Sequence, residues 1–331
     1  MSFLKTLALG TALAAALIAG PAQAENVKVA LVVKALGIGF FEAAKKGAEE
    51  AAKEVGDMEI IYTGPTSTTA EGQIEVINAL IAQRVDAIAI SANDKDAVAP
   101  ALKKAMDRGI KVISWDSGVA PEGRLVHLNP SSNSLIGNQL LKLAQAALPE
   151  GKGDIAILSA TATSTNQNTW IEELKKAQPN YPGINVVTTV YGDDLADKSY
   201  RETQGLLQTY PNVKVIVAPT SVGIVAAAQA VSDAGKVGEV FVTGLGLPSE
   251  MAGHVKSGAS KSFSIWNPID LGYSAAMISY HIVKGTAKGE PGETIPIGRV
   301  GQVAFDGNGE GAMADPFTYD ASNVEEFAKI F

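Results

Sequence analysis

From residue 26 onward, short runs of β-branched residues alternate with longer amphipathic stretches, and this alternation restricts the possible folds more than any other feature of the sequence. The first strands are predicted at residues 26–33, 58–63, 87–91 and 111–114, from the length and the composition of these runs. Apolar residues at helical spacing lie between them, at residues 39–55, 69–84 and 100–108. Because each helix carries the chain back to where the next strand begins, the pattern predicts a parallel, doubly wound sheet.

A second cycle of the same kind begins after residues 125–130. Helices are predicted at residues 132–148, 166–178, 195–210 and 222–234. Strands are predicted at residues 154–159, 186–191, 213–217 and 240–243. The fold class is therefore α/β, with two doubly wound, Rossmann-like lobes.

Beyond residue 244 the remaining elements are too few for a third domain: a strand at 262–265, a helix at 270–284 and an extended stretch at 295–305 with a turn at 306–309. We expect the chain to return to the first lobe and then to the second. The predicted N-terminal lobe comprises residues 25–128 and 265–295, and the C-terminal lobe residues 129–264 and 296–331. A multi-crossing hinge is then expected near residues 129–130, 264–266 and 295–298.

The first 24 residues have the parts of a secretory signal peptide. Lys5 precedes an apolar run at residues 6–20, and Pro-Ala-Gln-Ala follows before Glu25. The run is shorter than the roughly 18 apolar residues that a membrane span needs. We expect cleavage after Ala24 and a periplasmic protein.

Composition excludes several functions. Lysine and arginine total 27 against 35 aspartates and glutamates, a net charge of −8 that argues against binding to nucleic acid. The chain has no cysteine, which excludes disulfides, thiol catalysis and thiolate metal sites. The three histidines lack metal-binding spacing, and Gly37-x-Gly39 lacks the third glycine of a dinucleotide fingerprint. We therefore expect no cofactor, no metal and no catalytic residue.

Polar and aromatic side chains follow the predicted strands at their carboxyl ends, where ligands bind in open α/β sheets. Trp115 and Asp116 end one strand, and all three tryptophans lie at strand ends or in the loops that follow them. The ligand-binding candidates are Lys34, Phe40, Phe41, Trp115, Asp116, Asn166, Gln167, Trp170, Pro219, Ser221, Gly246, Trp266 and Asn267.

This set of residues suits a sugar, whose hydroxyls need donors and acceptors and whose C–H faces need aromatic planes. Asp116 can accept hydroxyl hydrogen bonds, and Lys34 is placed to neutralise its charge. The pair Asp193-Asp194 is interpreted as the solvated start of a helix.

The chain also resembles a known family, the type I periplasmic solute-binding proteins of ABC importers. The resemblance depends on the signal peptide, the two lobes and three motifs: Gly-Phe-Phe at 39–41, Glu-Gly-Gln at 71–73 and Trp-Asp-Ser at 115–117. Further motifs are similar to those of rhamnose-binding proteins, with the autoinducer-2 receptors as cousins; they lie at residues 62–66, 129–132, 165–168 and 244–251.

The resemblance implies ligand contacts at Lys34, Asp116, Asn166, Gln167, Pro219 and Ser221. Autoinducer-2 receptors typically carry aspartate at the position of Asn166 and alanine at that of Ser221. Arabinose- and ribose-binding relatives usually carry aspartate at the position of Gly246. These departures favour rhamnose.

Three hypotheses follow. The first is a monomeric, non-enzymatic binding protein that delivers a deoxysugar to a membrane permease, with a methyl pocket built from Leu36, Phe40, Phe41 and Leu247. The second is an autoinducer-2 receptor. The third is an exported carbohydrate-active enzyme, which needs two carboxylates facing one glycosidic bond. Only Asp116 is expected in the cleft.

Overall fold

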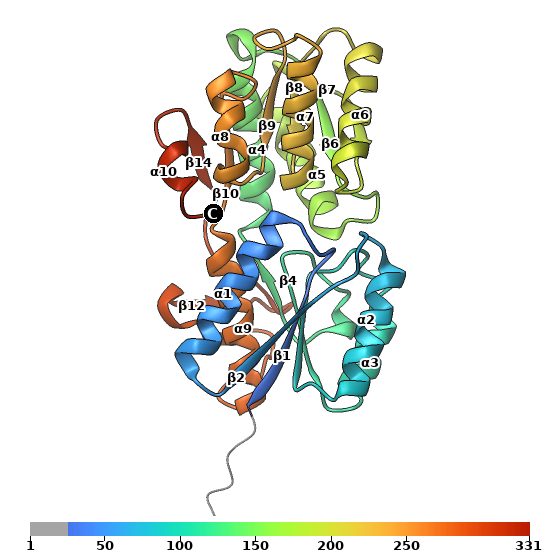
Figure 1. The fold of residues 1–331 in the computed structure, drawn as a ribbon, viewed down its shortest axis with the longest axis vertical. Helices are drawn as coiled ribbons and strands as arrows, with labels where there is room; N and C mark the ends of the chain where they lie inside the picture. The colour runs from blue at the N-terminus through green and yellow to red at the C-terminus, as the bar shows by residue number, and fades with distance from the viewer. Residues whose placement is uncertain (1–25) are drawn as a thin grey trace, which may run out of the picture.

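The computed structural model describes residues 26–331 and shows two α/β lobes, one above the other (Figure 1). The predicted signal peptide lies outside the described residues. None of the helices within residues 26–331 is both long and apolar enough to span a membrane.

The N-terminal lobe is built on a six-stranded parallel sheet with the order β13-β5-β4-β3-β1-β2. Its strands are β1 (Val27–Val32), β2 (Met58–Thr63), β3 (Ala87–Ile90), β4 (Lys111–Trp115), β5 (His127–Asn129) and β13 (Glu310–Ala312). The helices that connect them are α1 (Gly39–Val55), α2 (Ala70–Gln83) and α3 (Ala99–Met106). The doubly wound sheet predicted for the first lobe is thus confirmed.

One face of this sheet is covered by α1 and by α9 (Pro268–Lys284), which returns to the lobe from far along the chain (Figure 1). The two helices touch backbone to backbone at a pair of glycines. A Cβ atom at Gly47 would stand 1.7 Å from the Ile269 carbonyl oxygen, and one at Gly272 would stand 1.9 Å from that of Ala44. Only glycine permits this approach.

The C-terminal lobe has a four-stranded parallel sheet with the order β7-β6-β8-β9. Its strands are β6 (Gly153–Ser159), β7 (Ile184–Tyr191), β8 (Val213–Ala218) and β9 (Phe241–Gly244). Its helices pair as α4 (Asn133–Ala147) with α5 (Thr165–Ala177), and α6 (Ala196–Thr209) with α7 (Ser221–Asp233). Outside the sheet, β10 (Ser262–Ile265) pairs with β14 (Phe317–Asp320), and α8 (Pro248–Ser257) packs against α10 (Val324–Phe327).

The chain passes between the lobes at residues 130–132, 266–267 and 313–316. The first and third passages run side by side, since the backbone N–H groups of Met313 and Ala314 donate to the carbonyls of Asn129 and Pro130. Two crossings lie near the predicted positions.

The third crossing, predicted at 295–298, lies elsewhere. Residues 294–304 form the hairpin β11 (Thr294–Pro296) and β12 (Gln302–Ala304), which packs on α9 in the N-terminal lobe. Strand β13 then pairs with β5 in the N-terminal sheet, so residues 296–312 lie with the N-terminal lobe and not, as was predicted, with the C-terminal lobe. A three-residue strand carries too little hydrophobic pattern to reveal its partner.

Candidate functional site

The carboxyl ends of both sheets meet at a cavity between the lobes. The order of the strands reverses between β1 and β3 in one sheet and between β6 and β8 in the other. Open α/β sheets bind their ligands beside such a point of reversal. The cavity is lined by Lys34, Ile38, Phe40, Phe41, Asp116, Asn166, Gln167, Trp170, Asp194, Pro219, Thr220, Ser221, Leu245, Ile265 and Trp266.

Asp116 lies directly after β4 in a left-handed backbone conformation, with φ of 57°. Its carboxylate is buried, and one oxygen accepts a hydrogen bond from the Ser91 hydroxyl at 2.7 Å. Aspartate tolerates this conformation better than most residues. Asp116 therefore ends the strand at the wall of the cavity between the lobes.

Asn166, at the start of α5, connects the two charged groups of the N-terminal lobe. Its side-chain oxygen accepts from the Lys34 ammonium at 2.8 Å, and its side-chain nitrogen donates to Asp116 at 3.1 Å. Lys34 also donates to the Ser164 hydroxyl at 2.8 Å. The expected direct pair between Lys34 and Asp116 is therefore replaced by a link through a neutral amide from the other lobe.

The charge state of Asp116 follows from its surroundings. Burial raises the pKa of its carboxyl above the ordinary value, while the Lys34 ammonium and the hydrogen bonds from Ser91 and Asn166 act in the opposite direction. Nearby Asp194 adds to the upward shift. The groups that favour the ionised form of Asp116 are thus contributed by both lobes, so closing the cleft assembles them.

Hydrogen-bonding capacity remains in the cavity after these contacts are counted. The Gln167 side-chain oxygen accepts from the Ser159 hydroxyl and the Ala160 N–H, at 2.9 and 2.7 Å. Both bonds are to the oxygen, and the side-chain nitrogen makes none to other groups of residues 26–331. The buried indole N–H of Trp266 likewise lacks one in the described part of the chain. An unpaired buried donor such as this indole N–H is costly, and a ligand oxygen would satisfy it.

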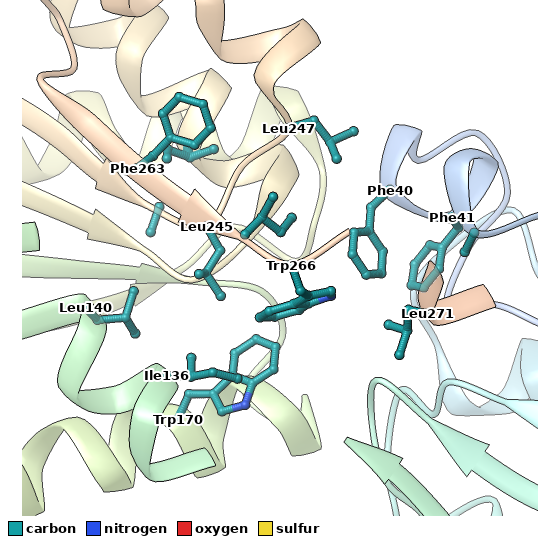
Figure 2. Packing of buried hydrophobic residues seen from close by; sticks show 14 of the residues in the cluster. Phe40, Phe41, Ile136, Leu140, Trp170, Leu245, Leu247, Phe263, Trp266 and Leu271 are labelled. Atoms are coloured by element: carbon teal, nitrogen blue, oxygen red, sulfur yellow. The ribbon is translucent and has the colours of Figure 1, made fainter. Parts of the chain in front are cut away.

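Aromatic rings form a continuous series through the cleft, and Figure 2 shows Trp170, Trp266, Phe40 and Phe41 of this series. Trp266 lies between Trp170 and Phe40, with ring centroids 5.5 and 6.3 Å away, and Phe40 meets Phe41 at 5.3 Å. Phe41 in turn contacts Trp115 at 5.9 Å. All four contacts are edge-to-face, the arrangement that aromatic pairs favour. The series joins the lobes and gives the cavity an apolar wall.

Ten of the thirteen predicted ligand-binding residues line this cavity. The other three lie beside it. Trp115 is fully buried behind Phe41, and Gly246 packs against Ile224 and Met251. The Asn267 side-chain oxygen caps α9 by accepting from the Ile269 and Asp270 N–H groups.

The residues predicted to form the methyl pocket lie only partly in the cavity. Phe40 and Phe41 line the cavity, but Leu36 and Leu247 do not, and Ile38 takes their place.

Sequence reasoning missed five lining residues: Ile38, Asp194, Thr220, Leu245 and Ile265. Asp194 follows β7 at its carboxyl end, so the same strand-end rule could have found it. The cavity therefore holds two carboxylates, Asp116 and Asp194, where one was expected. Within residues 26–331, no three histidine, cysteine or acidic side chains gather closely enough to hold a metal ion.

Two lobes that enclose a small cavity of mixed polar and aromatic character define a solute-binding protein. Comparison with known sequences agrees, because residues 29–287 match the periplasmic binding protein domain. The chain belongs to this family.

Several solved or named proteins are similar to the chain. An ABC transporter solute-binding protein from Clostridium phytofermentas, solved with bound L-rhamnose, is 36% identical with a TM-score of 0.89, over 92% of this chain and 99% of that one. LsrB from Clostridium saccharobutylicum, solved with AI-2, is 26% identical with a TM-score of 0.85, over 91% and 99%. The D-ribose/D-allose-binding protein of Pseudomonas aeruginosa is 27% identical, over 66% of this chain and 70% of that one. Like these relatives, the chain is a binding protein and not an enzyme.

Proposed function

We propose that this protein captures a monosaccharide, L-rhamnose in the first instance, between its lobes and delivers it to the permease of an ABC importer. The observation that carries the proposal is the cavity itself. Charged and amide groups joined by Asn166 stand beside a wall of aromatic rings. A sugar ring needs both kinds of surface, the first for its hydroxyls and the second for its C–H face.

The size of the cavity favours a single sugar ring. Its free volume is about 420 Å³, near the lower end of the roughly 300–1,000 Å³ that small-molecule pockets span. An oligosaccharide is therefore a poor candidate for the closed form. The L-rhamnose bound by the 36% identical relative is a ligand of suitable size.

The apolar part of the wall favours a deoxysugar. Ile38, Phe40 and Phe41 come from one short segment at the start of α1 and present only carbon to the cavity. A methyl group can pack there without cost, whereas a hydroxyl would lose its hydrogen bonds to water. L-Rhamnose carries such a methyl at C6.

An autoinducer-2 receptor is the alternative, supported by the similarity to LsrB. The position of Asn166 argues against it. Its amide fits between Lys34 and Asp116 because one end accepts and the other donates. An aspartate there, as the receptors typically carry, would place a second negative charge against Asp116.

The wider role follows from the family. We propose export to the periplasm with removal of residues 1–24, action as a monomer, and closure of the lobes about residues 130–132, 266–267 and 313–316. A ligand can drive closure only if it binds the closed form better than the open one. The contacts of Asn166 with both lobes supply such a difference.

The test is a calorimetric titration with L-rhamnose, L-mannose, D-ribose and autoinducer-2. L-Mannose is the matched control, since it differs from L-rhamnose only by a hydroxyl at C6. An unpaired buried hydroxyl costs about 1–3 kcal/mol, so L-rhamnose should bind about 5- to 150-fold more tightly. Equal or tighter binding of L-mannose or autoinducer-2 would overturn the deoxysugar assignment. Conversion of any ligand to a product would contradict a purely binding role.

A further inference from the structure

The turn between β7 and α6 has an unusual backbone. Asp193 and Asp194 both adopt the left-handed conformation, with φ of 56° and 53°. Two consecutive non-glycine residues in this region are uncommon, although aspartate tolerates it better than most. Such strain persists only where the surrounding structure holds it, and it often marks a functional site. The two residues are thus more than the solvated helix start that the sequence suggested.

The turn is held firmly to the C-terminal lobe. The N–H groups of Gly192 and Asp193 donate to the carbonyls of Ser159 and Ala160, at 2.8 and 3.1 Å. The Asp193 carboxylate pairs with the Lys198 ammonium at 2.6 Å. These bonds connect the turn to the end of β6, immediately before the loop that leads to Asn166.

Asp194 is one of the residues that line the sugar cavity. One of its oxygens accepts a hydrogen bond from the Thr220 hydroxyl, whose oxygen in turn caps α7 by accepting from the Gly223 N–H at 3.1 Å. A carboxylate has about four acceptor positions. Acceptor positions therefore remain on Asp194, which lines the same cavity as Asp116.

The main chain of the same turn touches the other lobe. The Asp193 carbonyl oxygen accepts from the Thr68 hydroxyl at 2.7 Å, and Thr68 lies between β2 and α2 in the N-terminal lobe. The bond can exist only while the cleft is closed. Within one turn, Asp194 therefore lines the cavity, and the adjacent Asp193 is hydrogen-bonded to the opposite lobe.

We infer that the β7–α6 turn determines specificity and couples it to closure: Asp194 is a second carboxylate acceptor for sugar hydroxyls, and the Asp193 carbonyl secures the closed form through Thr68. The inference rests on the proposed sugar-binding function. It adds Asp194 as a charged acceptor in the C-terminal lobe, where the sequence had predicted the neutral amides of Asn166 and Gln167.

The first experiment compares Asp194→Asn with Asp197→Asn by calorimetry with L-rhamnose. Asparagine tolerates the left-handed conformation and can still accept from Thr220, so the fold should be kept. Asp197 is exposed in the first turn of α6 and controls for the lost charge. A charged acceptor is stronger than a neutral one, so Asp194→Asn should weaken binding at least about fivefold relative to the control.

A ratio within twofold would overturn the role of Asp194. If Asp194→Asn lowers the melting temperature, Asp194→Gly is the second variant, because glycine adopts the same backbone conformation without a carboxylate. Failure of the wild type to bind any sugar would instead refute the proposed function. If the wild type prefers another sugar of the panel, the comparison is made with that sugar.

The second experiment tests the coupling with Thr68→Val and the neighbouring Thr66→Val. Thr66 is exposed and its hydroxyl has no hydrogen bond within residues 26–331. Loss of one neutral hydrogen bond in the closed form should weaken L-rhamnose binding by about two- to fivefold in Thr68→Val only. Equal affinities of the two variants would show that the Asp193 carbonyl plays no part in closure.

Discussion

The first four strands of each lobe follow the same order in their sheet, but the two lobes contribute different chemistry to the cavity between them. The N-terminal lobe supplies a buried ammonium and a buried carboxylate, Lys34 and Asp116. The C-terminal lobe supplies mainly neutral groups, the amides of Asn166 and Gln167 and the indole of Trp170, and Trp266 lies at a crossing between the lobes. The shared scaffold fixes where strand ends meet, and the residues placed there decide what is bound.

The difference explains why neither lobe holds a complete site. Lys34 and Asp116 are not paired with each other, and the amide that satisfies both belongs to the opposite lobe. In an open cleft, water must take its place. Closure exchanges water for Asn166 and the ligand, so binding and closure are parts of one equilibrium.

The largest effect is expected from removing the carboxylate of the N-terminal lobe. Asp116→Ala should abolish measurable sugar binding, because loss of a buried charged partner costs about 2–5 kcal/mol, or at least about 30-fold in affinity. Calorimetry measures it, with exposed Asp96→Ala as the control. Since alanine disfavours a φ of 57°, Asp116→Asn serves as a second variant that keeps the backbone. Affinity like that of the wild type in both variants would reduce Asp116 to a turn residue.

A smaller effect is expected from placing a negative charge in the C-terminal lobe at the position of the Asn166 amide. Asn166→Asp should weaken L-rhamnose binding by about tenfold at pH 7.5, because a second carboxylate would stand where the amide nitrogen lies 3.1 Å from Asp116. Binding should recover toward pH 5.5, as one of the two carboxyls takes up a proton. Asn168→Asp, on the same helix but outside the cavity, is the control. Unchanged affinity and no dependence on pH would contradict the bridging role of the amide.

The lobes should also differ in their response to acid. Burial, with a contribution from Arg124, lowers the pKa of His127 in β5 to about 3. Below pH 6.5 the His127 imidazole is protonated in the unfolded protein, whereas in the folded protein it stays neutral until the pH approaches 3. The free energy of unfolding therefore falls as the pH falls from 6.5 toward 3. The slope contributed is at most about 1.4 kcal/mol per pH unit. The effect is absent above neutral pH, where both states are unprotonated.

Urea unfolding between pH 7 and pH 4 measures this slope. His127→Gln should flatten it by about 1 kcal/mol per pH unit. Partial burial also lowers the pKa of His254 in the C-terminal lobe, so His254→Gln should change the slope in the same direction but less. Equal slopes in the wild type and in His127→Gln would assign the acid sensitivity to other groups.

The smallest effect is expected in the radius of gyration, which should fall as the lobes close on the ligand. With L-rhamnose at saturation, small-angle scattering should show a smaller radius of gyration than without it. The Thr68→Val variant should respond less, since one interlobe hydrogen bond of the closed form is lost. An unchanged radius in the wild type would mean that the cleft is closed before the sugar arrives.

The sequence alone was sufficient to predict most of the elements, because hydrophobic periodicity is a local property. Helix α1 was predicted with its observed bounds of residues 39–55, and β2 and β10 were likewise predicted correctly. The rule that ligands bind at the carboxyl ends of parallel strands then located ten of the fifteen residues that line the cavity.

Tertiary structure decided what depends on partners distant in sequence. It placed β13 beside β5, turned Asn267 into a helix cap and buried Trp115 behind Phe41. It also brought Asp194 into the cavity and set Asn166 between Lys34 and Asp116. Periodicity reports which face of an element is buried, but the direction of a side chain at a strand end depends on backbone strain and on the opposite lobe, neither of which has a local pattern.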